Sequence, residues 1–150
     1  NGGYRVIKTA LVTEALEAEG TTVKVNKSHL FAVGDFVTVG GGLKGASDKI
    51  TAIDKSNAGY DVITLEAKIG AAKVGQVLVG VKEKTTAGKA TLVTSSSELV
   101  ITLSKVDLTV ANQSCGLMAR GTISEGNMPF PIDAGLKALM SLIRFVNKKS

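Results

Sequence analysis

Aromatic residues and cysteine are scarce in this sequence. It contains four Phe, two Tyr and no Trp, whereas proteins that stack nucleic-acid bases or sugar rings usually carry more aromatic side chains. The composition therefore counts against nucleic-acid-binding and carbohydrate-binding modules. The only cysteine, Cys115, excludes an internal disulfide and fits a reducing compartment. Its apolar neighbours predict a buried, inert thiol.

Long hydrophobic runs and histidine clusters are also absent. No apolar stretch approaches the roughly 18 residues that a membrane-spanning helix needs, so we expect no membrane contact. No signal-peptide pattern is present, but the chain begins at Asn1 without Met, so this second absence carries little weight. The one histidine, His29, has no His or Cys partner in a metal-ligand spacing, which favours a structural or surface histidine.

Arginine is the third deficit. The formal net charge is +5, but there are 15 Lys against 3 Arg, and no run of five basic residues occurs. Arginine is the usual residue for bidentate contacts to bases and phosphates. We therefore expect the lysines to lie on a solvated surface, and we do not expect nucleic acid as a partner.

What the sequence does contain is a series of short β-like runs. Residues 30–81 hold four runs rich in Val, Ile and Thr, each closed by glycine or a polar turn, which is typical of half-buried strands. They are residues 36–39, 50–53, 62–65 and 77–79. A further strand at 21–25 should point Val23 and Val25 inward. Five or six short strands in about 60 residues predict a small SH3-like β-barrel.

Two details refine this prediction. The step Val-Gly-polar at 33–35 recurs at 74–76, each time directly before a strand, and glycine there allows a sharp turn. Residues 4–18 fit either a helix or a strand, and we expect a strand that enters the first sheet.

The whole chain is predicted to be mainly β with one C-terminal helix. Residues 1–81 should form the barrel, 82–97 a polar linker or crossing segment, and 98–150 antiparallel strands plus the helix. The strands are expected at 99–103, 106–110 and 117–123. Asp133 can cap a helix, and the apolar residues that follow have the spacing of one face of a three-turn helix. They are Leu136, Leu139, Met140, Ile143 and Val146.

No motif indicates reaction chemistry. Gly40, Gly42 and Gly45 have GxGxxG spacing, but a strand follows them instead of the helix that a phosphate site requires. The acidic pairs, Asp54 with Asp61 and Glu125 with Asp133, are each explained by a turn or a helix cap. We therefore expect a protein that is not an enzyme and that binds no cofactor or metal.

Arg120 and Arg144 lie in apolar segments near the C-terminus. The apolar helix has more surface than one small sheet covers, which favours an oligomer contact in which arginines pair with carboxylates or carbonyls of another subunit. An intramolecular salt bridge or an exposed head is an equally open alternative. The residues we expect at the oligomer interface are Met128, Phe130, Leu139, Leu142, Ile143, Arg144 and Phe145.

Several of these segments resemble the phage head fibre and capsid decoration family, with relatives in phages and prophages of gut bacteria. They are residues 30–40, 50–54, 60–65, 119–125, 128–132 and 142–145. The resemblance implies a non-enzymatic virion protein on the capsid surface, trimeric, made in the cytoplasm of a bacterial host. Its partners would be its own copies and the phage capsid protein. A small-barrel nucleic-acid-binding module, suggested by the lysines, is the alternative.

Overall fold

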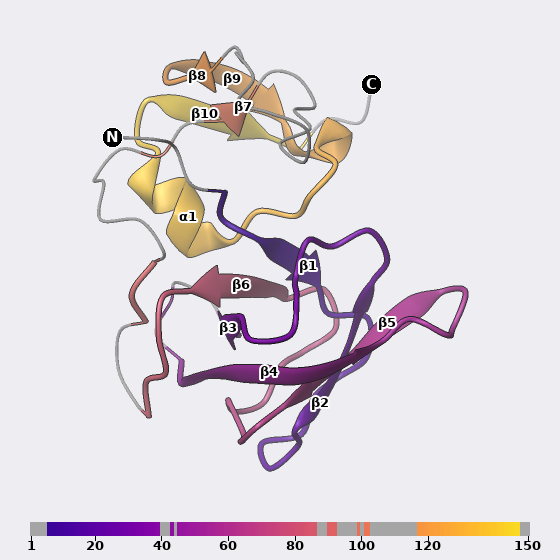
Figure 1. Ribbon diagram of the computed structural model, residues 1–150. Helices are drawn as coiled ribbons and strands as arrows, with labels where there is room; N and C mark the ends of the chain where they lie inside the picture. Colours follow the sequence, from indigo (N-terminus) through magenta and orange to yellow (C-terminus); the bar gives the residue numbers. More distant parts are fainter. Residues whose placement is uncertain are drawn as a thin grey trace, which may run out of the picture.

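The computed structural model describes residues 6–39, 43, 45–86, 90–92, 99, 101–102 and 117–147. This part of the chain is mainly β with one short helix, as the sequence predicted (Figure 1). Six strands form an antiparallel sheet in the order β1-β6-β3-β4-β5-β2. Their bounds are β1 Thr9–Leu11, β2 Thr22–Asn26, β3 Phe36–Thr38, β4 Ser47–Asp54, β5 Tyr60–Leu65 and β6 Val77–Val81.

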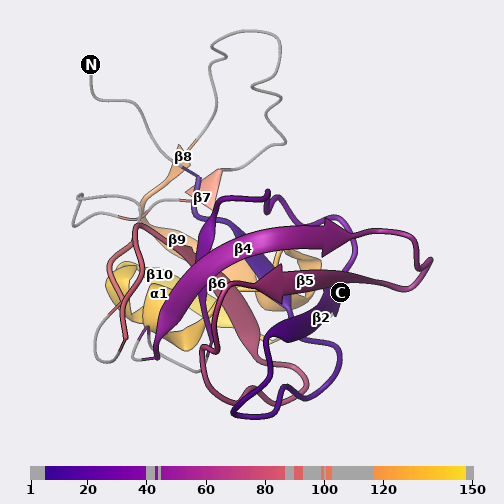
Figure 2. The same cartoon turned by 60° about the horizontal axis from the view of Figure 1, so that its bottom comes forward.

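The six-stranded sheet curls until its two edge strands meet. Directly after β1, Val12 forms a single antiparallel bridge with Val25 of β2, and Thr13 N–H donates to Lys24 O at 2.9 Å. The long strand β4 curves across this sheet in Figure 2, with a register shift after Ile50. The ambiguous N-terminal segment thus supplies a strand, as expected, and the sheet wraps around its core without a continuous ladder at the seam.

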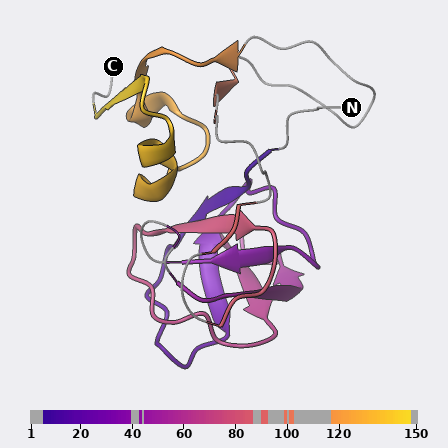
Figure 3. The ribbon, with the colours of Figure 1, turned by 90° about the vertical axis from the view of Figure 1, so that its left-hand side faces the viewer.

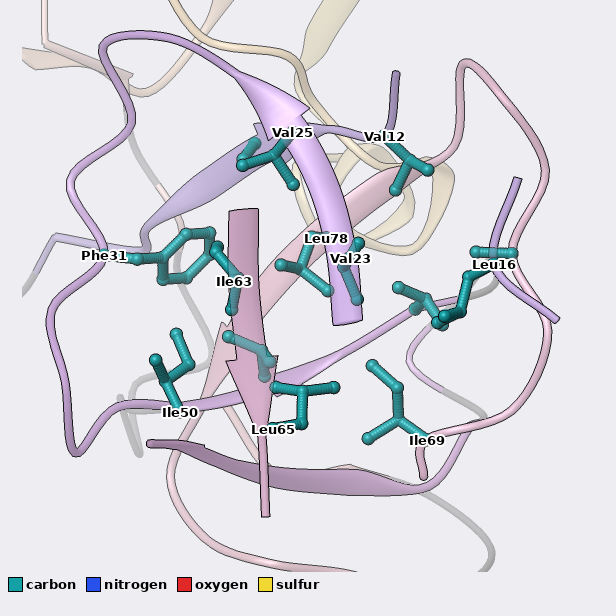
Figure 4. Packing of buried hydrophobic residues seen from close by; sticks show 14 residues of the cluster. Val12, Leu16, Val23, Val25, Phe31, Ile50, Ile63, Leu65, Ile69 and Leu78 are labelled. Atoms are coloured by element: carbon teal, nitrogen blue, oxygen red, sulfur yellow. The ribbon is translucent and has the colours of Figure 1, made fainter. Parts of the chain in front are cut away.

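Inside the curl lies a core made almost entirely of aliphatic side chains (Figure 4). Ile50, Ile63 and Leu78 are completely buried and come from three different strands. The predicted inward residues Val23 and Val25 are 1% and 0% exposed, which confirms the alternation read for β2. Because this core takes one side chain in two from each strand, it needs no aromatic residue except Phe31.

The sheet repeats its pairing scheme. If β1, β2 and β3 are exchanged with β4, β5 and β6, the same set of neighbouring strands results, and the seam between β1 and β2, which has a single bridge, corresponds to the ladder between β4 and β5. Val12 N–H donates to Gln76 O at 2.8 Å, and in the corresponding place Ile50 N–H donates to Asp35 O at 2.8 Å. Corresponding strands also pair with each other, β3 with β6 and β2 with β5. The sheet therefore has an approximate internal two-fold relation.

The Val-Gly-polar step that the sequence repeats at 33–35 and 74–76 lies in two turns that the internal two-fold relation makes equivalent. Residues 32–35 lead into β3 and residues 73–76 lead into β6. In each turn the side chain of the last residue accepts a hydrogen bond from the N–H of the first at 2.8 Å. Gly34 has φ +98° and Gly75 has φ +85°, a backbone conformation that side chains with a Cβ rarely adopt. The predicted role of both glycines is confirmed.

The C-terminal part packs on one side of the sheet, over β6 and β1 (Figures 1 and 3). Its elements are β7 Ile101–Thr102, β8 Leu117–Met118, β9 Gly121–Ser124, the 3-10 helix η1 Glu125–Asn127, α1 Ala134–Leu139 and β10 Ile143–Val146. A second apolar cluster joins Leu136, Met140 and Ile143 to Val79 and Val81 of β6. The faces of β6 therefore serve two cores, one inside the curl and one beneath the C-terminal part.

The predicted three-turn helix is wrong beyond its second turn. Asp133 caps α1 as expected, since its carboxylate accepts from Gly135 N–H at 2.6 Å, but the helix ends at Leu139. Residues after it form β10, in which Ile143 is buried and Arg144 exposed. The apolar spacing fitted both a helix and an alternating strand, and pairing with β9 decided between them.

The further strands were expected to be antiparallel. β7 and β8, within the strands expected at 99–103 and 117–123, pair in this way, whereas β9 pairs in parallel with β10, which lies in the expected helix. The segment between them, which contains η1 and α1, is long enough to return the chain to the same end of the sheet, as a parallel connection requires. The expected strand at 117–123 is broken after Met118 into β8 and β9, and Gly121 has φ +153°.

Residues 82–97 were predicted as a linker or crossing segment. Those that the structure describes are attached to the sheet: Thr85 bridges Ser47, Leu92 bridges Val81, and Ala90 is 3% exposed. The expected strand at 106–110 and Cys115, Gly40 and Gly42 lie outside the described residues, as does part of the strand expected at 99–103.

Candidate interaction surface

A groove of about 500 Å³ separates the C-terminal part from the edge of the sheet. Residues 128–132 line one side of it, and Leu11 and Val77 line the other. Residues 128–132 are extended because Pro129 and Pro131 fix their own φ angles. Each proline also keeps the residue before it out of the helical region. The groove is thus an open channel in which polar side chains, Asn26, Glu125 and Lys137, line the wall together with apolar ones.

A single ion pair stands at the polar end of the groove. Lys137 Nζ of α1 lies 2.5 Å from Glu125 Oε2 of η1, and the same ammonium lies 5.8 Å from the centre of the Phe145 ring. The side chains of Lys137 and Glu125 are 30% and 29% exposed. Solvent therefore screens the ion pair, and its contribution to stability is small. Its geometric effect is to tie η1 to α1 at this end of the groove.

The exposed leucine pair, Leu139 and Leu142, lies on another surface. These side chains are 47% and 57% exposed. They flank the connection between α1 and β10, which in Figure 1 lies at the opposite end of the C-terminal part from η1. The C-terminal part therefore presents a groove of mixed polarity at one end and an exposed apolar pair at the other.

The seven residues predicted at an oligomer interface are divided among three environments. Met128 and Phe130 line the groove, and the leucine pair is exposed. Ile143 is 6% exposed and belongs to the second apolar cluster, beneath the C-terminal part, and Phe145 packs against that cluster. Both residues therefore contribute to the core of a single chain. Arg144 is exposed.

Arg120 is exposed as well. Neither it nor Arg144 forms an ion pair within the part of the chain that the structure describes. The sequence left three alternatives open for these two arginines. Their exposed positions fit a solvated guanidinium group or a contact with another molecule, and they do not fit an intramolecular salt bridge among the described residues.

The histidine occupies a buried site in the connection from β2 to β3. The side chain of His29 is 0% exposed, and its Nδ1 accepts a hydrogen bond from Phe31 N–H at 3.2 Å. Its Nε2 lies 3.1 Å from Asp61 Oδ2, off the line of the ring N–H, so it makes no hydrogen bond within the described residues. Burial lowers the pKa of His29 below its ordinary value, and the neighbouring Asp61 carboxylate opposes this only in part.

Asp61 is itself buried, and Lys27 neutralises it. Lys27 Nζ lies 2.5 Å from Asp61 Oδ1 and also donates to Lys55 O at 3.0 Å. Because a lysine already balances the carboxylate, the site does not require a charged imidazole. His29 is a structural histidine, in agreement with the first of the two environments expected from the sequence.

The acidic pairs found in the sequence serve local structure. Asp54 accepts from Ser56 N–H at 2.9 Å in the β4–β5 turn, which lowers the pKa of Asp54, and Asp133 caps α1. Among the residues with a described position, no three His, Cys, Asp or Glu side chains are grouped to hold a metal. In the same residues no helix is long and apolar enough to cross a membrane.

Comparison of the chain with protein-family models, with curated proteins and with solved structures finds no match. The features that sequence reasoning missed are the groove and the two exposed turn valines, Val33 and Val74, which are 61% and 64% exposed. The repeated Val-Gly step was the signal that could have identified the valines, because the residue before a turn glycine projects from the tip. Nothing local in the sequence indicates the groove, since its sides come from distant segments.

Proposed function

We propose that the chain is a non-enzymatic virion structural protein, a head fibre or capsid decoration subunit that binds the phage capsid and assembles with its own copies as a trimer. The resemblance of six segments to that family supports the proposal; they are residues 30–40, 50–54, 60–65, 119–125, 128–132 and 142–145. So does the mainly β fold, which is common in proteins whose function is adhesion to other protein surfaces.

The observation that carries the self-assembly part is the presence of two different surfaces on one chain, a groove of mixed polarity and an exposed apolar pair. A closed ring of three subunits requires a head-to-tail contact, in which one surface of each subunit meets a different surface of the next. The groove and the exposed leucine pair are such surfaces, at opposite ends of the C-terminal part. On this proposal the leucines of one subunit enter the groove of its neighbour, and Arg144 lies at the edge of the contact.

The test is the mass in solution of Leu142→Asp. The chain has a mass of 15.5 kDa, and light scattering after gel filtration should give about three times this value for the natural sequence and the single-chain value for the variant. Leu142 is 57% exposed, so the substitution leaves the core of the subunit intact. Leu30→Asp is the matched control, because Leu30 is 50% exposed but lies on the β2–β3 connection, and it should remain trimeric.

Two outcomes would contradict the proposed assembly. The natural chain could be monomeric at tens of micromolar, or Leu142→Asp could keep the mass of the natural chain. Phe145→Asp is a less specific variant, because Phe145 also packs in the second core and its loss would destabilise the subunit. For the virion assignment, the genes beside this one decide: genes for a major capsid protein, portal or terminase would support it, and their absence would count against it.

The net charge of +5 favours a second candidate, a small-barrel module that binds nucleic acid. Six of the described lysines lie within 4 Å of a carboxylate, which leaves less uncompensated charge than the composition implies. They are Lys8, Lys24, Lys27, Lys68, Lys84 and Lys137. Retention on heparin or DNA that weakens steeply with salt would support this candidate, and elution at low salt would remove it.

A further inference from the structure

The connection from β2 to β3, residues 27–35, is held from its interior by two buried side chains, Phe31 in the core and the imidazole of His29. The bond from Phe31 N–H to His29 Nδ1 joins a side chain to the backbone two residues later. The chain makes the same type of bond elsewhere with residues that do not titrate near neutral pH. They are Asn57 to Gly59 N–H, Asp54 to Ser56 N–H and Asp133 to Gly135 N–H, at 2.6 to 2.9 Å. The fold therefore does not need a histidine for such a bond.

The internal two-fold relation supplies a second comparison. The connection from β5 to β6, residues 66–76, corresponds to the β2–β3 connection and also ends in a Val-Gly turn. Its buried anchor is the aliphatic residue Ile69, 2% exposed, with Ala72 at 3%. Both connections are thus fixed by buried apolar side chains, Phe31 at 4% and Ile69 at 2% exposed, but only the β2–β3 connection adds a buried group with an ordinary pKa near 6.5, His29.

Protonation of His29 is incompatible with the observed bonding. A neutral ring that accepts at Nδ1 carries its proton on Nε2, which faces Asp61. The charged ring carries a second proton on Nδ1, so this atom would then face the Phe31 N–H donor with a donor of its own. The charged groups around the ring are Asp61 on β5, Lys55 in the β4–β5 turn and Lys27 in the connection itself. The two lysines oppose a further positive charge.

We propose that the β2–β3 connection is a pH-sensitive latch: it is fixed at neutral pH by the neutral His29 ring and released in mild acid when the ring is protonated. Release would free the segment that carries Leu30 and Val33, which are 50% and 61% exposed. The β5–β6 connection, with no buried titratable group among its residues, would stay closed. This proposal is independent of the assignment to a virion.

The direction follows from proton linkage. The pKa of His29 is lower in the folded chain than in the unfolded one, where it is near 6.5, so the unfolded or open form binds more protons in acid. The latch is fully stable above the unfolded pKa and loses stability as the pH falls from there through the folded pKa. Below the folded pKa the loss is complete.

Hydrogen exchange of individual amides in the full chain tests the latch, because each connection provides a reporter. Phe31 N–H bonds His29, whereas Ala72 N–H bonds Leu16 O at 2.9 Å in the corresponding connection. After correction for the intrinsic effect of pH, protection at Phe31 should fall by up to about tenfold for each pH unit between the unfolded pKa, near 6.5, and the lower folded pKa, and should not fall further below the folded pKa. Protection at Ala72 should not change.

The matched variant is His29→Asn, which keeps an acceptor two residues before Phe31 and removes the titration. Its Phe31 protection should be independent of pH between 7.5 and about 5. Equal pH dependence in the natural chain and in the variant would overturn the proposal, as would parallel behaviour of Phe31 and Ala72. If the variant does not fold, a nuclear magnetic resonance titration of the natural His29 ring decides: a ring that stays neutral down to pH 4.5 would also overturn the proposal.

Discussion

The internal two-fold relation predicts that two distant glycines are equally important. Gly34 and Gly75 occupy equivalent turns with φ +98° and +85°, and no other atom lies within 4 Å of the position that a Cβ would take at either site. Replacing either with Ala therefore adds no collision, and the cost is backbone strain alone. That strain is about 1–2 kcal/mol for an L-residue in a left-handed conformation.

Part of this strain is offset, because alanine lowers the entropy of the unfolded chain by the equivalent of about 0.4–1 kcal/mol. We expect Gly34→Ala and Gly75→Ala each to reduce the free energy of unfolding by about 1 kcal/mol, with values that agree within about 0.5 kcal/mol. In urea unfolding this corresponds to a midpoint lower by about 0.3–1 M.

Gly59→Ala is the control for the glycine pair. Gly59 lies in the β4–β5 turn without a positive φ, and the nearest atom to an added Cβ is Asn57 Oδ1 at 3.6 Å. Only the entropy effect remains there, so the stability should be unchanged or slightly higher. Gly34→Asn should restore part of the loss, because Asn tolerates left-handed backbone better than Ala. Losses that differ by more than 1 kcal/mol between Gly34 and Gly75, or an equal loss at Gly59, would refute the equivalence of the turns.

Three further predictions concern the core, the helix cap and the buried charge. Ile63→Ala should lower the unfolding free energy by about 2–5 kcal/mol, measured in denaturant, because Ile63 is 0% exposed at the centre of the barrel core; a loss below 1 kcal/mol would contradict this packing. Asp133→Ala should cost about 0.5–2 kcal/mol through the lost bond to Gly135 N–H, with faster amide exchange at Gly135 as the local signature. Lys27→Met should raise the pKa of His29, because a positive charge is removed and Asp61 loses its counter-ion. Nuclear magnetic resonance titration of the His29 ring measures this pKa, and a value equal to or lower than that of the natural chain would contradict the prediction.

The sequence by itself determined the strands of the barrel. Short runs of Val, Ile and Thr separated by glycine have no stable alternative to half-buried strands, because they are too short for helices and too apolar for loops. The alternation in β2 placed Val23 and Val25 in the core, where they are 1% and 0% exposed. The Val-Gly echo predicted both sharp turns, since positive φ is a local requirement that only glycine meets without strain.

Tertiary structure decided the C-terminal part. Residues 140–146 have an apolar pattern compatible with a helix, but residues 143–146 form β10 because β9 offers a parallel partner and Ile143 completes the core under β6. The same context placed Ile143 and Phe145 within one chain while leaving Leu139 and Leu142 exposed. Backbone pairing between segments 20 residues apart carries no signal in either segment alone.

The groove and the His29 site were also decided by distant contacts. One side of the groove follows β9 and the other belongs to β1 and β6, so only the folded chain brings them together. A lone histidine in a polar segment gives no indication of burial. The carboxylate beside it comes from β5, 32 positions later in the sequence. The pairing of β2 with β5 places Asp61 opposite Val25, and the path of the connection after β2 brings His29 beside it.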